Sequence, residues 1–232
     1  CDAGASHSNI ILLLVEELMM EMDIEFPQLD FIALTRGPGS FTGLRIGIAV
    51  AQGLAFAHQI PVLPLSTLQA LAYSVYHDMS GESVSPKELA VLALLDARMQ
   101  QVYAGWYLCN ESGAHLNGIE DVLAPEKIQS LGMPVACNQS GQHTELTACT
   151  TLGKAVENAH CIFVGSGLDY YAAFPESWRD SVTHDQRPEQ CISIEGLSAL
   201  ALQMKGDKLK NCIPAVQLAV SYTHLTLPTR CL

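Results

Sequence analysis

The chain of 232 residues carries 12 Lys and Arg residues against 24 Asp and Glu residues, which gives a formal net charge of −12. An anionic surface of this strength repels nucleic-acid phosphates, which argues against tight nucleic-acid binding by this chain alone. The hydrophobic fraction of 49% predicts a folded protein, and the length allows one large domain or two small ones. The eight cysteines include no Cys-x-x-Cys pair, and there is neither a secretory signal nor a long apolar run, so we expect a reduced, cytoplasmic protein with no structural metal and no membrane contact.

The first predicted helix covers Asn9 to Met22, where apolar residues recur at helical spacing. One apolar stripe, expected to face the core, contains Ile11, Leu14, Val15, Leu18 and Met22. The other side, which carries Leu13, Glu16 and Met20 with Leu12 beside them, is too apolar for a purely solvated face. We expect either another helix of the same chain or a partner protein to cover it.

A strand, a tight loop and a helix are predicted between residues 31 and 57. Phe31 to Leu34 is a short apolar run typical of a strand, and Gly37-Pro38-Gly39 cannot continue it. Two interpretations of the loop remain open: a tight turn whose glycines serve packing, or an anion site at the N-terminus of the next helix. The candidate phosphate loop consists of Gly37, Gly39, Ser40, Thr42 and Gly43. Ser40 or Thr42 can cap the helix, and no lysine follows the last glycine as it would in a P-loop.

The helix from Gly43 to Ala57 is apolar on all sides except where Arg45 and Gln52 share one face. The opposite face, expected to pack on a sheet, contains Gly43, Gly47, Val50, Leu54 and Ala57. Ile48, Ala49 and Phe56 lie beside the polar pair. A helix this apolar is buried on more than one side, and we expect a partner to cover the side that carries Arg45.

The remaining chain alternates between apolar runs and polar turns. The expected elements are a strand at 60–65, a helix at 68–77, a strand at 89–95, a turn at 96–98, a strand at 101–108, a turn at 110–113, a strand at 118–123, a helix after Pro125, a strand at 161–164, a helix from Leu168 and an amphipathic helix at 194–205. Residues 78–88 are polar and turn-rich, so we place a domain boundary there. The alternation predicts an α/β protein with parallel sheets in two lobes, residues 1–85 and 86–219. Residues 220–232 do not continue the pattern and are expected to be a non-native tail.

Several motifs carry a resemblance to a known family. Arg36-Gly-Pro-Gly-Ser-Phe-Thr-Gly-Leu-Arg-Ile-Gly47, followed by Ala51 to Ala55 and Ser66 to Leu68, closely resembles the TsaB (YeaZ) family of tRNA threonylcarbamoyladenosine biosynthesis proteins. Asp96 to Tyr103 and Val164 to Gly167 are similar to later segments of that family. The resemblance runs from about residue 5 to about residue 215 and implies an actin-like (ASKHA) fold of two related α/β lobes.

The resemblance also implies a paralogue, the TsaD transferase, which moves a threonylcarbamoyl group onto the adenosine beside the tRNA anticodon. That enzyme holds its catalytic metal with two histidines four residues apart after a strand. The matching positions here are Thr67 and Leu71. Neither side chain replaces imidazole as a ligand for an iron- or zinc-like ion, so we expect no catalytic residues and no metal in this chain.

What the resemblance implies is therefore a pseudoenzyme subunit that binds and supports a TsaD-like transferase through helices of the first lobe. The predicted interface residues are Leu12, Leu13, Glu16, Met20, Arg45, Ile48, Ala49, Gln52 and Phe56. A TsaE-like ATPase is the second expected partner, with ATP entering only at the level of the complex and tRNA contacted only indirectly. A homodimer through the same helices is a further expectation.

Two other expectations follow from the same residues. An actin-like nucleotide-dependent enzyme, or a peptidase-like protein, is the alternative function, with the loop from Gly37 to Gly43 and the turn from Gly165 to Gly167 flanking a nucleotide. Members of the family begin with two or three strands before the point at which this sequence starts. We therefore expect a fragment whose first lobe is incomplete and whose stability alone is weak.

Overall fold

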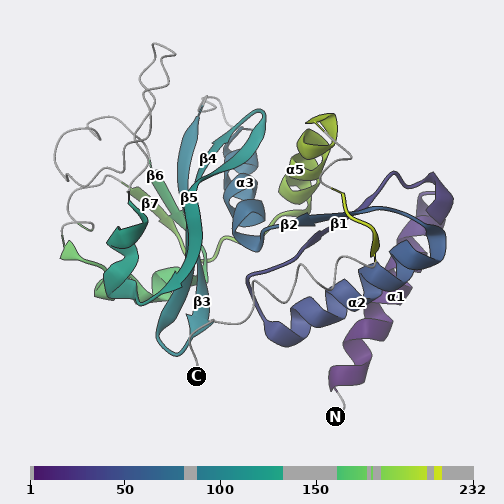
Figure 1. The fold of residues 1–232 in the computed structure, drawn as a ribbon, viewed down its shortest axis with the longest axis horizontal. Helices are drawn as coiled ribbons and strands as arrows, with labels where there is room; N and C mark the ends of the chain where they lie inside the picture. Colours follow the sequence, from purple (N-terminus) through teal and green to yellow (C-terminus); the bar gives the residue numbers. More distant parts are fainter. Residues whose placement is uncertain are drawn as a thin grey trace. The chain divides into compact units, whose positions relative to one another are not determined.

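The chain divides into two compact units, seen in a computed structural model that describes residues 3–80, 88–132, 161–176, 179, 184–207 and 212–215 (Figure 1). The first unit comprises residues 1–67 and 204–232, and the second comprises residues 68–203. Each unit has its own sheet, so the two are described separately.

The first unit contains a β–α–β arrangement preceded by a helix. Its elements are α1 (Ala3–Glu21), the 3-10 helix η1 (Phe26–Gln28), β1 (Ile32–Thr35), α2 (Phe41–His58) and β2 (Val62–Leu65). β1 and β2 are parallel, with Ile32 opposite Val62. Near the other end of the chain, Ile213 returns to β2 and forms an antiparallel bridge with Val62. The strand, loop and helix predicted between residues 31 and 57 are confirmed, with α2 starting two residues earlier than expected.

α2 is limited by local hydrogen bonds at both ends. The side chain of Ser40 accepts a bond from the backbone N–H of Gly43 at 3.5 Å, as expected of an N-cap. At the other end Gln59 adopts a left-handed conformation with φ 56° and donates its N–H to the carbonyl of Ala55. The hydrophobic run after residue 59 therefore leaves the helix and enters β2.

The side of α2 that faces the sheet is not the predicted one. The helix buries Ile48, Ala51 and Ala55, and Ile48 and Ala55 meet Val62 and Ala215 in the core of the first unit. The predicted sheet face of Gly43, Gly47, Val50, Leu54 and Ala57 was wrong, because Gly43 and Ala57 are exposed and the other three are only partly buried. A helix that is apolar on every side gives no internal signal for which side meets the strands, and here their positions decide it.

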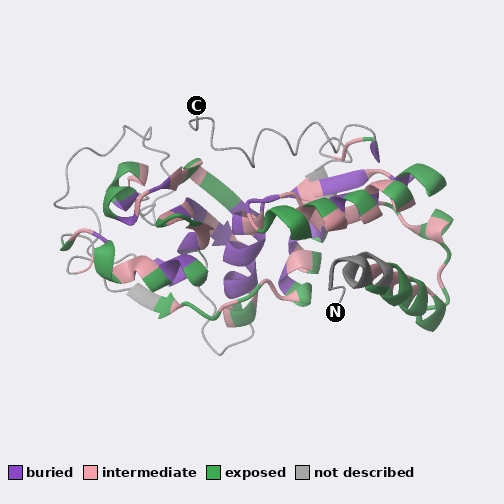
Figure 2. Ribbon diagram, turned by 90° about the horizontal axis from the view of Figure 1, so that it is seen from below, coloured by how far each residue is buried: buried purple, intermediate pink, exposed green. Residues whose placement is uncertain are grey.

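α1 lies on the side of α2 that faces away from β1 and β2, and much of its surface is exposed (Figure 2). Ile11, Val15 and Met19, which succeed one another by four residues, are half-buried. The predicted core stripe was wrong for Leu14, Leu18 and Met22, which are 57%, 57% and 59% exposed. α1 therefore rests on a narrow row of side chains rather than on the broad stripe that the sequence suggests.

The second unit is built on a five-stranded sheet. Its elements are α3 (Thr67–Ser80), β3 (Leu89–Arg98), β4 (Gln101–Asn110), β5 (Gly113–Leu123), the 3-10 helix η2 (Pro125–Leu131), β6 (Cys161–Val164), the 3-10 helix η3 (Ser166–Ala173), β7 (His184–Arg187) and α5 (Ile194–Asp207). The strand order is β5-β4-β3-β6-β7. β4 is antiparallel to both β3 and β5, whereas β6 is parallel to both β3 and β7. The expectation of parallel sheets is correct for only one side of this sheet.

The core of the second unit lies among β3, β4 and β6. The rings of Trp106 and Phe163 meet edge to face with centroids 5.8 Å apart. α3 joins this unit by hydrogen bonds, since the Gln69 side chain donates to the Ala114 carbonyl at 2.9 Å and the Ser74 hydroxyl accepts from the Ser193 N–H at 3.1 Å. These contacts explain why the units divide after residue 67, whereas the predicted boundary at 85 falls in residues 81–87, outside the described residues.

Several elements of the second unit differ from the predictions. The turn predicted at residues 96–98 is part of β3, which pairs through Arg98 with Gln101, so the turn lies at Met99 and Gln100. β7 was missed, because its sequence His-Asp-Gln-Arg contains no apolar residue. The helices expected after Pro125 and from Leu168 are both 3-10 helices. Among the described residues, no helix has the length and hydrophobicity needed to cross a bilayer.

Candidate partner interface on α1 and α2

An open, apolar groove runs between α1 and α2 on the side of α2 opposite its core face. It has a volume of about 460 Å³. Its lining residues are Leu12, Arg45, Ile46, Ala49, Val50, Gly53 and Leu54. We call this surface the α1–α2 groove. Among the residues that the structure describes, Arg45 is the only charged one that lines the groove. An apolar side chain of a partner would therefore bury few polar groups there.

The groove follows from how α2 divides its apolar residues. Residues 44, 48, 51 and 55 take the side toward β1 and β2, which leaves Ile46, Val50 and Leu54 on the other side of the helix. A Cβ atom added at Gly53 would meet no described atom within 4 Å. The absence of a side chain at this position keeps the floor of the groove close to the helix backbone.

Arg45 is held at the edge of the groove by an aromatic neighbour. Its guanidinium carbon lies 3.7 Å from the centroid of the Phe41 ring, one turn earlier in α2. A cation–π contact at an exposed site contributes about 0.5–1 kcal/mol. The contact holds the guanidinium of Arg45 over the ring of Phe41.

The structure distributes the nine predicted interface residues over several positions. Leu12, Arg45 and Ala49 line the α1–α2 groove. Leu13, Glu16, Met20 and Phe56 are exposed elsewhere on the two helices, and Gln52 is half-buried. Ile48 is the exception and needs correction: it is 6% exposed and lies in the core of the first unit, where it cannot present its side chain to a partner.

Four groove residues were missed by sequence reasoning. Val50 and Leu54 were assigned to the sheet, and Ile46 and Gly53 were not assigned. Their spacing, at positions 46, 50, 53 and 54, is that of a helical stripe, so the signal was present in the sequence. It could not be separated from the stripe at 44, 48, 51 and 55, which has the same spacing and similar hydrophobicity.

The glycines of the candidate phosphate loop make packing contacts. The carbonyl of Gly37 accepts a hydrogen bond from the N–H of Thr67 at 2.8 Å, and a Cβ atom at Gly37 would lie 3.3 Å from the Leu44 side chain. Ser40 and Gly43 form the N-cap of α2. These contacts give the loop a role in joining β1, β2 and α2, and phosphate binding by it stays a prediction.

The turn after β6 also uses its glycines for packing. Gly165 has φ 101°, and a Cβ atom there would overlap the carbonyl oxygen of Leu94. A Cβ atom at Gly167 would lie 2.8 Å from the Cβ atom of Leu94. Both glycines therefore allow η3 to approach the backbone of β3, which accounts for the Gly-Ser-Gly sequence without a ligand.

Comparison with known proteins identifies the family to which this chain is similar. A family model described as "TsaD: tRNA N6-adenosine threonylcarbamoyltransferase" matches residues 2–224. Proteins named "tRNA threonylcarbamoyladenosine biosynthesis protein TsaB" are 40% identical over 101 residues in Haemophilus influenzae and 37% identical over 121 residues in Escherichia coli K12. A solved structure titled "YeaZ from Pseudomonas aeruginosa" has a TM-score of 0.69 and 30% identity, covering 92% of this chain and 82% of that one. The chain belongs to the TsaB (YeaZ) family.

Membership of the TsaB family confirms both the resemblance and the predicted actin-like α/β fold. The matched stretches cover 44% and 52% of this chain but only 40% and 49% of the two curated TsaB proteins. The chain thus spans less than half the length of these two curated relatives. This chain shares its fold and family with these relatives, but a match over part of their length does not establish its activity, substrates or partners.

The two positions that the transferase resemblance assigns to metal ligands are occupied in this TsaB-family chain by Thr67 and Leu71. Thr67 is the first residue of α3, and Leu71 is 2% exposed in the same helix. Leu71 also packs against Gly165, because its side chain would lie 2.8 Å from a Cβ atom there. A hydroxyl group and a buried aliphatic side chain do not fit a transition-metal ion at these two positions.

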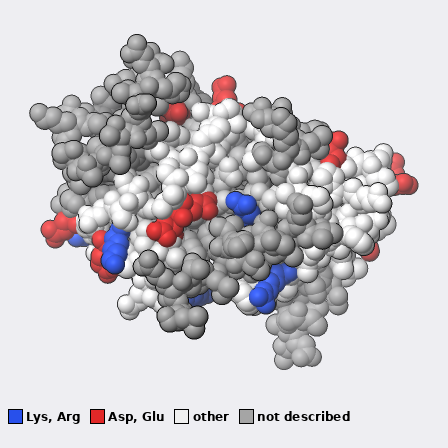
Figure 3. Space-filling view, in the orientation of Figure 1, with Lys and Arg blue, Asp and Glu red and all other residues white. Residues whose placement is uncertain are grey.

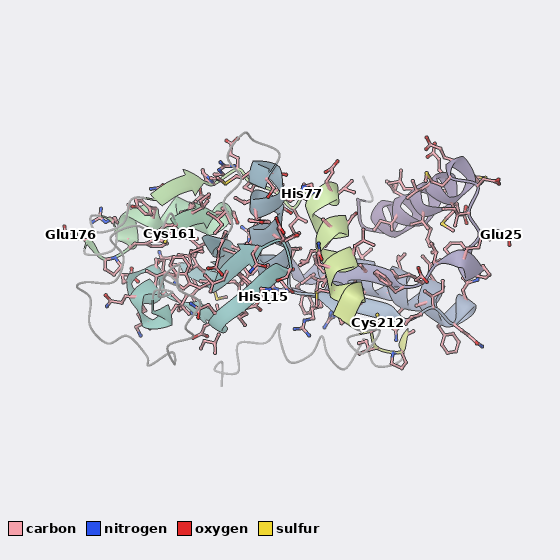
Figure 4. The ribbon with its side chains drawn as sticks, turned by 90° about the horizontal axis from the view of Figure 1, so that it is seen from above. Glu25, His77, His115, Cys161, Glu176 and Cys212 are labelled. Atoms are coloured by element: carbon pink, nitrogen blue, oxygen red, sulfur yellow. The ribbon has the colours of Figure 1, made fainter. Side chains whose placement is uncertain are left out.

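The buried thiols of this TsaB-family chain are poor nucleophiles. Cys109 and Cys161 are free and buried in the second unit, and Cys161 lies on β6 (Figure 4). Burial raises the pKa of Cys161 to about 11, and it raises the pKa of Cys109 well above its usual range. Both thiols therefore remain protonated at neutral pH, where only the thiolate would attack a substrate.

Proposed function

We propose that this chain is a non-catalytic subunit of the machinery that synthesises threonylcarbamoyladenosine in tRNA, and that it binds and supports a TsaD-like transferase. The observation that carries the proposal is the α1–α2 groove, an open apolar surface on the face of α2 opposite the core. The names of its TsaB relatives supply the pathway. The Thr67 and Leu71 side chains support the absence of chemistry, because they stand where the transferase would need imidazoles.

The groove has the features of a helix-binding surface. Its floor consists of Ile46, Val50 and Leu54, and the small residues Ala49 and Gly53 allow a second backbone to come close. The exposed, charged Arg45 stands at the margin. Exposed apolar side chains on α1, such as the 62% exposed Leu13, extend the surface beyond the groove itself. An amphipathic helix or helix pair from the transferase would bury this surface.

The other partners of the proposal follow from charge, from the family resemblance and from the groove itself. With a net charge of −12, the chain is suited to contact tRNA only through its partners, and we place the complex in the cytoplasm. A TsaE-like ATPase would bring ATP to the assembly. A second copy of this chain could occupy the same groove, and such a homodimer would compete with the transferase for it.

The nucleotide-dependent enzyme is the weaker alternative. It needs two glycine-rich turns open to a ligand, but a Cβ atom at Gly37, Gly165 or Gly167 would contact protein atoms. Packing therefore accounts for these glycines, which are the residues that the nucleotide-dependent alternative would need for ligand binding.

Size-exclusion chromatography with a TsaD-like transferase from the same source tests the proposal. We expect the two chains to elute together in one complex, and we expect the chain alone to hydrolyse no ATP above a buffer blank. Separate elution would refute the partner, and sustained ATP turnover by the chain alone would refute the non-catalytic role.

The substitution Gly53→Ala should affect partner binding in the α1–α2 groove and the stability of α2 in opposite directions. The change should stabilise the first unit by about 0.5–1 kcal/mol, because alanine is the better helix former and no described atom lies within 4 Å of the new methyl group. The same methyl group fills the groove floor, so affinity for the transferase should fall by about fivefold to tenfold. Urea unfolding and titration calorimetry measure the two effects.

Gly47→Ala is the matched control for this pair of effects. Gly47 also lies within α2 with no described atom near its Cβ position, but it does not line the groove. It should give the same gain in stability with unchanged affinity. Equal affinities for the Gly53→Ala and Gly47→Ala proteins would show that the partner does not enter the groove.

A further inference from the structure

A second groove lies at the corner where α1 ends and η1 begins, and it shares no lining residue with the α1–α2 groove. Its volume is about 620 Å³. Met19, Met20 and Phe26 supply apolar surface, and Glu16, Asp23 and Glu25 supply carboxylates. Glu25 is labelled in Figure 4 in the turn between α1 and η1. We call this surface the acidic corner groove.

The charge at this corner is of one sign. Residues 16–30 include six Asp and Glu residues and no Lys or Arg. On the visible face of Figure 3, acidic side chains (red) without basic neighbours (blue) mark the right-hand edge, where α1 ends in Figure 1. The two ion pairs found among the described side chains, Arg98–Asp96 and Arg179–Glu176, lie in the second unit. Within the described part of the chain, therefore, no salt bridge neutralises Glu16, Asp23 or Glu25.

The corner is held by backbone contacts and by one aromatic stack. Asp23, in a left-handed conformation with φ 51°, donates its N–H to the Met20 carbonyl at 3.2 Å. The N–H of Glu25 donates to the Gln28 side chain at 2.6 Å. The ring of Phe26 stacks on His58, the last residue of α2, with centroids 4.4 Å apart. These contacts fix the backbone of the corner before any ligand arrives, which reduces the entropy lost on binding.

We infer that the acidic corner groove docks a cationic amphipathic helix of a partner protein. Apolar side chains of such a helix would enter between Met19 and Met20, whose flexible thioethers adapt to different shapes. Its Lys and Arg residues would meet the carboxylates around the groove, which steers association and fixes orientation. This inference does not depend on the proposed function, because the α1–α2 groove could bind a transferase whether or not the corner binds anything.

Charge decides against other occupants. Nucleic acids and anionic lipid surfaces carry the same sign as the corner and would be repelled. A second copy of this chain would bring a second set of carboxylates to the same place. An apolar helix without basic residues would leave Glu16, Asp23 and Glu25 to lose hydration without a partner.

The probe for the inference is a fluorescein-labelled peptide of leucine and lysine, about five helical turns long, with all leucines on one face. Its anisotropy is titrated with the full chain at about 0.05 M and about 0.5 M salt. We expect saturable binding that weakens at high salt. A second peptide with serine in place of every leucine should bind at least about tenfold more weakly, because it buries no apolar side chains against Met19 and Met20.

The key variant is the double substitution Asp23→Asn and Glu25→Gln. Asparagine tolerates the left-handed conformation of residue 23. Glutamine at residue 25 keeps the backbone N–H that donates to Gln28 and a side-chain oxygen for the capping box of η1. The matched control is Glu126→Gln with Glu189→Gln, two exposed carboxylates of the second unit that change the net charge equally. We expect about a tenfold loss of peptide affinity for the corner variant and less than a twofold loss for the control.

Three results with the corner variant, its control and the two peptides would overturn the inference, and a variant of the α1–α2 groove supplies a fourth. The first three are equal losses for the corner variant and the control, equal binding of the leucine and serine peptides, and no saturable binding at either salt concentration. Ala49→Glu, placed in the α1–α2 groove, should leave peptide binding unchanged. If it abolished peptide binding while the corner variant did not, the peptide would be bound in the other groove and the corner would not be a docking site.

Discussion

Ala49→Glu is expected to lower the affinity for a TsaD-like transferase by at least about 100-fold, which corresponds to about 2.7 kcal/mol. Ala49 lies between Arg45 and Gly53 on the lining of the α1–α2 groove. A partner that fills the groove would have to bury the new carboxylate against Ile46 and Val50, where water could no longer solvate it. Titration calorimetry with the purified transferase measures the loss.

The fold should survive this substitution. Ala49 is exposed, and glutamate is nearly as good a helix former as alanine, so circular dichroism and the unfolding midpoint should change little. Ala172→Glu is the matched control, because Ala172 is an exposed residue of η3 in the second unit. The control should bind the transferase normally. Undiminished affinity of the Ala49→Glu protein would mean that the partner binds elsewhere.

Gly165→Ala is expected to destabilise the second unit by about 2–4 kcal/mol. The residue has φ 101°, which alanine adopts only with strain, and its Cβ atom would overlap the carbonyl oxygen of Leu94. Leu94 belongs to β3, the central strand of the sheet, so the backbone of β3 or of the turn must move to make room. Urea unfolding monitored by the fluorescence of Trp106, which packs on Phe163 of β6, reports this loss.

Gly132→Ala separates the backbone strain from the steric overlap. Gly132 also has a positive φ, 66°, but no described atom lies within 4 Å of its Cβ position. The change should cost only about 1 kcal/mol. If Gly165→Ala were no more destabilising than Gly132→Ala, the close approach of the turn to β3 would be absent in solution.

The sequence predicted best those elements whose ends carry strong local signals. The glycines and proline at 37–39 and the cap at Ser40 separate β1 from α2, and the alternation from Val102 to Leu108 matches β4. β7 lacked any such signal. Its residues pair through their backbones with β6, for example Cys161 with His184, and no side-chain pattern reveals that pairing.

The candidate interface was predicted only in part, for a physical reason. Hydrophobicity on a helix shows how much surface is buried, but not by which neighbour, when every side is apolar. Ile48 and Val50 are equally suited to a core or to an interface, and only the position of β1 and β2 placed Ile48 inside and left Val50 in the groove. Ala49 and Arg45 were found because a charge at position 45 excludes that side from the core.

The bridge between Val62 and Ile213 has a consequence for biosynthesis. The second unit is one continuous stretch, residues 68–203, inserted within the first. Since a ribosome releases a chain from its N-terminus, the second unit can fold as soon as it has emerged, whereas β2 gains its antiparallel neighbour only after the whole second unit has been made. The helices that form the α1–α2 groove are thus made before the second unit, and the sheet beneath them gains this strand neighbour only after it.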